Sequence, residues 1–257
     1  MSKKYFFFDI DGTLLSETDK KMPVSCTKTL AALKKRGHFV AIATSRPYIL
    51  TYEEAQSFHI HHFVCDGGDG LVINDQIIQI LPLNLSDAKE LVKETVKYQL
   101  PIAVSIDTTN NRYSPDDAFI NNYPYLQEAF DFVTLPDFDA LKAQAIHKMC
   151  ILCTREQEKL LPSLTKVPHY RLDEQCILVE ATDKYKGIIQ MMKYLHAPLE
   201  DVVVFGDGTN DLSMFKQAPC SIAMGNAVAD LKAIASYITE NASQDGIEKA
   251  CRHFGWI

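Results

Sequence analysis

The sequence has no apolar run near the roughly 18 to 20 residues that a membrane-spanning helix needs. An apolar start at residues 5–8 is broken by Asp9 and Asp11, well short of the hydrophobic part of a signal peptide. Long runs of one charge are missing as well. We therefore expect no membrane anchor and no export signal, which predicts a cytoplasmic protein.

Basic residues are the scarcer charged class, with 26 Lys and Arg against 33 Asp and Glu, and the net charge is −7. This balance suits a polyanionic partner poorly, so we expect neither nucleic acid nor an anionic membrane as partner. The seven cysteines are odd in number and scattered, unlike the dense, even set of a small disulfide-stabilised domain. We therefore expect these cysteines to be reduced thiols and not disulfides. The sequence leaves the oligomeric state unknown.

Glycine is absent from residues 83–183, although the chain holds 11 glycines. In this stretch we predict a helix capped by Ser86 and strands at 102–106, 148–153 and 177–180, which together indicate an α+β module. About 100 residues of this character between two other segments predict an inserted domain.

The flanking segments show short β-rich apolar runs, each followed by polar residues or glycine and separated by helical patterns. This is typical of buried parallel strands in a doubly wound α/β sheet. The predicted strands are residues 5–8, 39–43, 63–65, 202–205 and 220–223. We therefore predict that 1–82 and 184–257 form one α/β core with a doubly wound parallel sheet, and that 83–183 form a second domain.

Two acidic segments each follow a predicted strand of the core: Asp9-Ile10-Asp11-Gly12-Thr13 and Gly206-Asp207-Gly208-Thr209-Asn210-Asp211. Asp-Gly is also a common turn pair, and Asp and Asn are good helix caps, so each segment alone could serve only to turn the chain. The carboxyl ends of parallel strands meet at one sheet edge, where ligands bind. Carboxylates concentrated there repel one another, which predicts a bound hard cation such as Mg²⁺.

Two further segments carry polar groups that suit an anion. Thr44, Ser45 and Arg46 end another predicted strand and offer hydroxyls and a guanidinium to an oxyanion. Lysines at 184 and 186 precede a predicted helix, where a cation opposes the helix dipole. A broken local rule of this kind suggests a functional position.

Taken in chain order, these four segments resemble the four motifs of the haloacid dehalogenase (HAD) superfamily. The insertion and the later Met224-Gly225-Asn226-Ala227 resemble the Cof-type branch, subfamily IIB sugar-phosphate phosphatases with a type-two cap. The resemblance implies a HAD-like, Rossmann-like core with an inserted α+β cap. It also implies Mg²⁺-dependent hydrolysis of a small phosphorylated metabolite, in particular a sugar phosphate.

The resemblance further implies roles for individual residues. Asp9 would be the nucleophile that forms an aspartyl-phosphate, and Asp11 would be the general acid and then the base. Mg²⁺ would be held by the Asp9 carboxylate, the Asp11 main-chain carbonyl and Asp207, with Asp211 supporting from nearby. The expected phosphate-binding set is Gly12, Thr44, Ser45, Arg46, Lys186 and Asn210.

The sequence leaves alternatives for the lysine, for the residues that select the substrate and for the function. We choose Lys186 over Lys184 because Gly187 follows it, and Asp66 stands where relatives usually have Asn, which could repel an anionic substrate. Cap residues that could select the leaving group are Asn110, Arg112 and Asp116. A phosphomutase of the same superfamily and a non-catalytic phosphosugar-binding regulator are the alternative functions.

Overall fold

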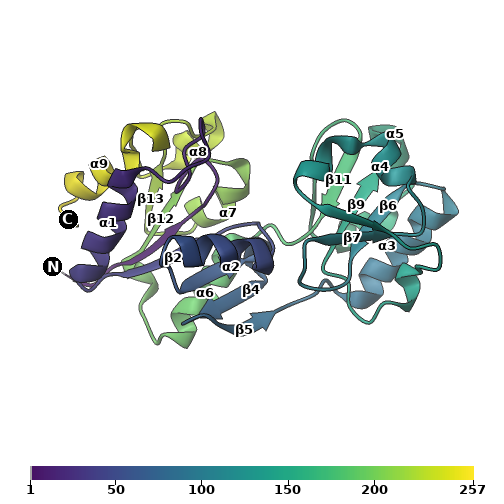
Figure 1. The fold of residues 1–257 in the computed structure, drawn as a ribbon, viewed down its shortest axis with the longest axis horizontal. Coiled ribbons are helices and arrows are strands. Elements are labelled where there is room, and N and C mark those ends of the chain that lie inside the picture. Colours follow the sequence, from purple (N-terminus) through teal and green to yellow (C-terminus); the bar gives the residue numbers. More distant parts are fainter. Residues whose placement is uncertain (1) are drawn as a thin grey trace. The chain divides into compact units, whose positions relative to one another are not determined.

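The computed structural model describes residues 2–257, and the chain separates into two compact units (Figure 1). The first, which we call the core unit, holds residues up to 46 together with 51–79 and 183–257. The second, the cap unit, holds residues 47–50 and 80–182. These limits lie within three residues of the boundaries expected from sequence, except for the short segment 47–50.

The core unit is built on an eight-stranded sheet in the order β14-β13-β12-β1-β2-β3-β4-β5. The pairs from β14 through β3 are parallel, and β4 runs antiparallel to β3. The strands are β1 (Tyr5–Phe8), β2 (Phe39–Ala43), β3 (His62–Cys65), β4 (Gly70–Ile73), β5 (Gln76–Ile80), β12 (Val202–Gly206), β13 (Cys220–Ala223) and β14 (Tyr237–Ile238). The five strands predicted for the core are all present.

Helices cover both faces of this sheet, and β1 shows why. Successive side chains of a strand point to opposite faces, and Phe6, Phe7 and Phe8 are all fully buried. Phe7 belongs to the hydrophobic cluster around α6, whereas Phe6 packs edge-on against Trp256, which follows α9, at 4.9 Å between ring centroids. The helices are α1 (Val24–Lys35), α2 (Tyr48–Ser57), α6 (Lys184–Tyr194), α7 (Leu212–Phe215), α8 (Ala229–Ile234) and α9 (Gly246–His253). The predicted doubly wound α/β fold is confirmed.

The cap unit contains a six-stranded sheet in the order β10-β11-β9-β6-β7-β8. Its strands are β6 (Ile102–Ser105), β7 (Asn111–Ser114), β8 (Asp131–Thr134), β9 (Lys148–Leu152), β10 (His169–Arg171) and β11 (Cys176–Val179), and its helices are α3 (Leu85–Lys97), α4 (Ala118–Asn122) and α5 (Arg155–Glu158). Helix α3 begins one residue before Ser86, and its cap is Asn84, whose Oδ1 accepts from the Asp87 amide at 3.2 Å. Among the described residues, no helix is both long and apolar enough to cross a membrane.

Candidate active site

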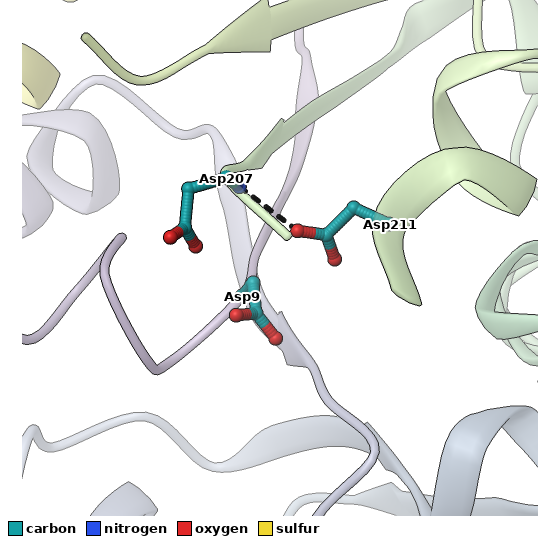
Figure 2. Close-up of side chains that lie close together, drawn as sticks. All are labelled: Asp9, Asp207 and Asp211. Carbon is teal, nitrogen blue, oxygen red and sulfur yellow. Dashed lines mark hydrogen bonds between the residues drawn. The ribbon is translucent and has the colours of Figure 1, made fainter. Parts of the chain in front are cut away.

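Three carboxylates gather at the carboxyl edge of the core sheet (Figure 2). Strands β1 and β12 are parallel neighbours paired through Phe8 and Phe205, so the loops that follow them leave the sheet side by side. Asp9 comes from the first loop, and Asp207 and Asp211 come from the second. One oxygen of each carboxylate lies within 4.8 Å of the other two. The two acidic segments therefore meet, as their places after parallel strands predict.

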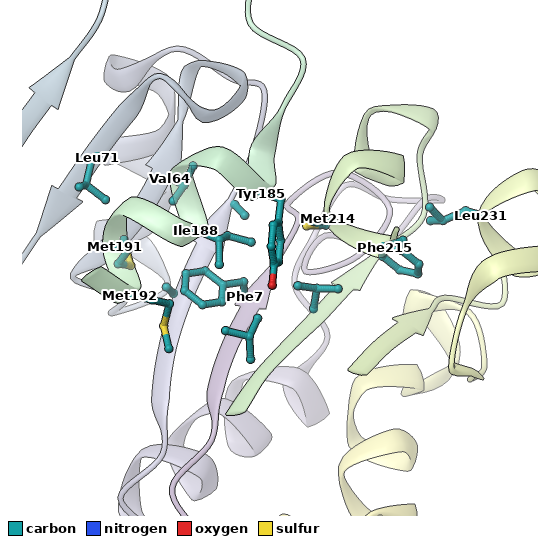
Figure 3. Packing of buried hydrophobic residues seen from close by; sticks show 14 of the residues in the cluster. Phe7, Val64, Leu71, Tyr185, Ile188, Met191, Met192, Met214, Phe215 and Leu231 are labelled. Carbon is teal, nitrogen blue, oxygen red and sulfur yellow. The ribbon is translucent and has the colours of Figure 1, made fainter. Parts of the chain in front are cut away.

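A buried lysine lies between two of these carboxylates. The Nζ of Lys184 is 2.6 Å from Oδ1 of Asp9 and 2.6 Å from Oδ1 of Asp211, and the lysine side chain is fully buried. Lys184 is the first residue of α6, because Asp183 caps the helix by accepting from the Lys186 amide at 3.1 Å. Further along α6, Ile188 packs with Phe7 of β1 in the sheet core (Figure 3). This packing fixes where Lys184 enters the cluster.

The structure corrects the choice of Lys186. Its Nζ pairs with Oδ1 of Asp69 at 2.7 Å, and about half of its side chain is exposed, so it takes no part in the carboxylate cluster. Gly187, which favoured Lys186 in the sequence, serves close packing instead. A Cβ there would lie 2.3 Å from Cγ1 of Val64 and 2.8 Å from the Gly68 carbonyl oxygen. The lysine of the cluster is Lys184.

Asp211 is held by backbone donors on its free side. Its Oδ2 accepts from the amides of Asp207 and Gly208 at 2.9 and 3.0 Å, while its Oδ1 receives Lys184. With all of these donors and full burial, Asp211 shapes the second acidic loop and positions the lysine. Asp211 thus lies beside both Asp207 and Lys184, and the supporting metal role expected for it stays a prediction.

Two residues beside Asp207 received no role from the sequence. Thr13 donates from its hydroxyl to Oδ1 of Asp207 at 3.2 Å, and Asn226 donates from its amide to Oδ2 at 3.1 Å. Asn226 also donates to the Gly12 carbonyl oxygen at 2.8 Å, so it ties the first acidic loop to the second. Both residues lie in segments that carry the family resemblance, and this resemblance was the signal by which the sequence could have identified them.

Asp11 lies apart from the buried carboxylates, with its side chain half exposed. Arg46 donates two hydrogen bonds to the Asp11 carboxylate, from Nε to Oδ2 at 2.9 Å and from Nη2 to Oδ1 at 2.7 Å. Its Nη1 also lies 3.3 Å from Oε1 of Glu54. The Arg46 guanidinium is thus engaged by the carboxylate two residues after Asp9, a pairing that the sequence did not predict.

The remaining predicted residues lie in the segments that follow β2, β3 and β12. Thr44 is buried and its hydroxyl accepts from the Arg46 amide at 3.2 Å. Ser45 accepts at Oγ from Nδ2 of Asn210 at 3.3 Å, which joins two of the expected phosphate-binding groups. Asp66 is buried with a φ of +49°, a conformation that Asp tolerates better than most residues. Its amide donates to the Arg46 carbonyl oxygen at 2.8 Å.

Burial and mutual repulsion shape the charge of the cluster. Burial raises the pKa of Asp9 to about 8; Lys184 opposes this, while the charges of Asp211 and Asp207 add to it. Burial and the charge of Asp211 raise the pKa of Asp207 to about 6. Burial alone would lower the pKa of Lys184, but the charges of Asp211 and Asp9 outweigh it and raise that pKa. Three carboxylates against one lysine leave an excess of negative charge, and carboxylate oxygens are the donors that Mg²⁺ prefers.

A family model described as haloacid dehalogenase-like hydrolase matches residues 6–251. The chain belongs to this family. The resemblance expected from the sequence is therefore confirmed, and the core and cap units are those of a haloacid dehalogenase-like phosphatase.

Relatives of this haloacid dehalogenase-like chain align along its whole length. It is 31% identical to YkrA of Bacillus subtilis (strain 168), named provisionally as a phosphatase, over 100% of both chains. It is 25% identical to the 5-amino-6-(5-phospho-D-ribitylamino)uracil phosphatase YitU of the same organism, over 96% of this chain and 95% of the relative. The solved structure of the HAD subclass IIB sugar phosphatase BT4131 superposes with a TM-score of 0.80 at 30% identity, over 99% of this chain and 100% of that one.

The raised pKa of Asp9 predicts a pH dependence for the metal-free phosphatase. Asp9 titrates near 8 when folded and near its ordinary 3.8 when unfolded, so between these values the native state binds the extra proton and stability falls as pH rises. His62, whose pKa burial lowers to about 4, acts in the opposite direction only below about pH 6.5. In EDTA, we expect the melting temperature to fall between about pH 6.5 and 8.

Differential scanning fluorimetry across this pH range checks the expectation. The Asp9→Asn variant cannot titrate at this position and should show a flatter profile. Added Mg²⁺ should stabilise wild type more at the upper end of the range, because metal binding displaces the proton. A melting temperature that rises with pH in EDTA, equally in both proteins, would contradict the assignment of Asp9 as the raised group.

Two glycines offer a matched pair for the acidic loop. Gly12 has a φ of +72°, and a Cβ there would lie 2.1 Å from Oδ2 of Asp207. Gly37 has a φ of +83°, but a Cβ there would meet nothing within 4 Å. Gly37→Ala should therefore cost about 1 to 2 kcal/mol for the left-handed backbone alone. Gly12→Ala carries that cost and also displaces Asp207, which should weaken Mg²⁺ binding about 10- to 100-fold.

Urea denaturation and Mg²⁺ titration calorimetry of both glycine variants separate the two effects. Gly37→Ala should retain the Mg²⁺ affinity of wild type despite its lower stability. Equal Mg²⁺ affinities in the two variants would show that the contact between Gly12 and Asp207 does not shape the metal site.

Proposed function

We propose that the chain is a Mg²⁺-dependent phosphatase that hydrolyses a small phosphorylated metabolite through a phosphorylated Asp9. The observation that carries this proposal is the state of Asp9 itself. Lys184 holds its Oδ1, whereas Oδ2 accepts no hydrogen bond from any residue the structure describes. A buried carboxylate with one anchored and one available oxygen is suited to nucleophilic attack.

The donor set of the cluster fits Mg²⁺. We infer that Asp9, Asp207 and the main-chain carbonyl of Asp11 hold the ion, and that Asp211 supports them through the loop that it shapes. When bound, Mg²⁺ offsets the negative charge of the carboxylates and of the phosphoryl group that approaches them.

Different side chains of the protein then carry out the separate steps of the reaction. Asp9 Oδ2 forms a bond to phosphorus as the bond to the leaving alcohol breaks, and Asp11 gives its proton to that alcohol oxygen. Asp11 next takes a proton from water, which attacks the phosphoryl group and releases phosphate and the Asp9 carboxylate. Lys184 keeps Asp9 oriented and reduces its charge.

Hydroxyl and amide groups beside the cluster would bind the phosphoryl oxygens. Thr44, Ser45 and Asn210 supply them from two loops, and a hydrogen bond of 3.3 Å from Asn210 Nδ2 to Ser45 Oγ joins these loops. Arg46 keeps the half-exposed Asp11 in place until a substrate arrives. Fixed donors of this kind stabilise a phosphoryl group mainly by position and charge.

Two relatives narrow the substrate class. One is named for a sugar phosphate activity and another for a phosphate ester on a ribityl chain. Both names describe a phosphate ester of a polyhydroxylated carbon chain. We therefore propose a sugar phosphate or sugar-alcohol phosphate as the substrate.

A panel of hexose, pentose and sugar-alcohol phosphates, assayed by phosphate release, tests this proposal. Hydrolysis should require Mg²⁺ and stop when EDTA is added. A hexose 1-phosphate should yield free hexose and phosphate. Its conversion into the 6-phosphate without phosphate release would identify a phosphomutase instead, and activity that persists in EDTA would overturn the metal requirement.

A further inference from the structure

The cap unit contains a buried arginine whose hydrogen-bonding capacity is largely unused. Arg112 lies on β7 and is fully buried. Its Nη1 donates to the carbonyl oxygens of Asn110 and Asn111, at 3.4 and 3.1 Å. Its Nε and Nη2 are buried without a hydrogen bond of normal geometry, the buried thiol of Cys150 lies beside the guanidinium, and no ion pair in the described part of the chain includes this arginine. Burial of such a cation is unfavourable unless something pairs with it.

Strand register places Arg112 in a row of polar residues across the cap sheet. Val104 pairs with Tyr113, so the next pair toward the end of β6 is Ser105 with Arg112. Ser105 also pairs with Lys148 of β9 on its other side. Directly opposed residues share a face of the sheet, so the arginine and the lysine lie on one face with a serine between them.

The nearest carboxylate in this row is already engaged. Glu180 follows β11, and its Oε2 lies 3.1 Å from Nζ of Lys148, with both side chains buried. Its Oε1 accepts from the Tyr170 hydroxyl at 3.1 Å. The buried carboxylate of Glu180 is therefore bound to the lysine and not to the arginine. The guanidinium is left without a counter-charge.

Phe130 covers the face of this guanidinium. Its ring centroid lies 4.1 Å from Cζ of Arg112, and the phenylalanine is itself partly exposed. The ring offers its π electrons to the guanidinium face and leaves the Nε and Nη2 hydrogens unpaired. Because Phe130 is partly solvent-exposed, a rotation of this one side chain would change the access of solvent and small molecules to the guanidinium.

We propose that the cap unit contains an oxyanion-binding site centred on Nε and Nη2 of Arg112, with Phe130 as its movable cover. The ligand is a carboxylate or phosphate group of a small molecule. The Nε and Nη2 edge of a guanidinium matches two oxygens of either group. The site lies wholly within the cap unit and does not depend on the phosphatase mechanism.

Arginine side-chain NMR of the full-length protein in EDTA tests this site directly. Inorganic phosphate and succinate are the two probes, and the Nε signal of Arg112 is assigned by its loss in Arg112→Lys. We expect a saturable shift of that signal with at least one probe. Phosphate alone or succinate alone would each support the site and identify the group that it prefers.

Arg171 is the matched control, because its Nε and Nη2 already bind Glu158 at 3.0 and 2.6 Å. Its signal should not move in the same titration, and Arg171→Lys should leave probe binding unchanged. If Arg112→Lys does not fold, the same signal can be assigned from Phe130→Leu, which removes the ring beside it. Neither probe shifting the Arg112 signal, or all arginine signals shifting together, would overturn the proposal.

The Phe130→Leu variant also tests the cover. It keeps an apolar side chain but removes the ring that covers the guanidinium, so the anion should reach Nε and Nη2 more readily and the affinity for the probe should rise about two- to fivefold. An unchanged or weaker affinity would show that Phe130 does not act as a cover of the site. Phosphatase activity is measured separately with Mg²⁺, so a failure of the cap site is distinguishable from a failure of the proposed reaction.

Discussion

Asp9→Asn is expected to reduce Mg²⁺-dependent hydrolysis of p-nitrophenyl phosphate by at least about 10⁴-fold, because the proposed covalent intermediate forms on this carboxylate. Asparagine has the shape of aspartate, so Asp211 and Lys184 should remain paired at 2.6 Å and the fold should persist. The loss should therefore appear in kcat without a matching loss of stability.

The control is Asp19→Asn, which changes a carboxylate that is exposed on the surface of the core unit. It should retain the activity of wild type. Circular dichroism confirms that both variants are folded. Substantial turnover by the Asp9→Asn protein would remove Asp9 from the nucleophile role.

The second large effect is expected at Lys184 and not at Lys186. Lys184→Met leaves Asp9 and Asp211 buried without their shared cation, which should lower the free energy of unfolding by about 3 to 5 kcal/mol. The same change removes the group that orients the nucleophile, so activity should fall about 10²- to 10³-fold. Mg²⁺ should recover part of the stability, because it also offsets the two carboxylates.

Lys186→Met is the matched control two residues along the same helix. The lysine of its pair with Asp69 is half exposed, although the carboxylate is mostly buried, so loss of the pair should change stability by only about 1 kcal/mol. Urea denaturation and phosphatase assays compare the two variants. A larger loss of activity in Lys186→Met than in Lys184→Met would restore the choice made from sequence.

Much of the core was predictable because its strands can be identified from local sequence patterns. The run Phe6-Phe7-Phe8 is apolar on both faces and ends at Asp9, so it reads as a buried parallel strand with a polar loop at its carboxyl end. The same pattern recurs before Asp207. Adjacent parallel strands bring such loops together, which is why the acidic cluster follows from the sequence.

The lysine position was not predictable in this way, because it depends on contacts far apart in the chain. Asp183 caps α6, so the helix begins at Lys184 although both lysines were expected to precede it. Gly187 is small because it packs against Val64 and the Gly68 backbone. The presence of Gly187 after Lys186 therefore reflects packing and not catalysis. Local pattern cannot distinguish these two reasons.

Pairs of interacting side chains could not be predicted for the same reason. The hydrogen bond from Arg46 to Asp11 joins residues 35 positions apart. In the cap, the row that contains Arg112 and Lys148 exists only through strand register. The sequence indicates residue types and element ends, whereas the pairs depend on the final arrangement of strands.

In the proposed reaction the phosphoryl group passes through Asp9. Rapid acid quenching during turnover of a ³²P-labelled sugar phosphate, followed by proteolysis and mass spectrometry, tests it most directly. We expect a transient phosphorylated peptide that contains Asp9, and no such peptide in Asp9→Asn. Full turnover by wild type without any phosphorylated Asp9, or with the label on another residue, would contradict it.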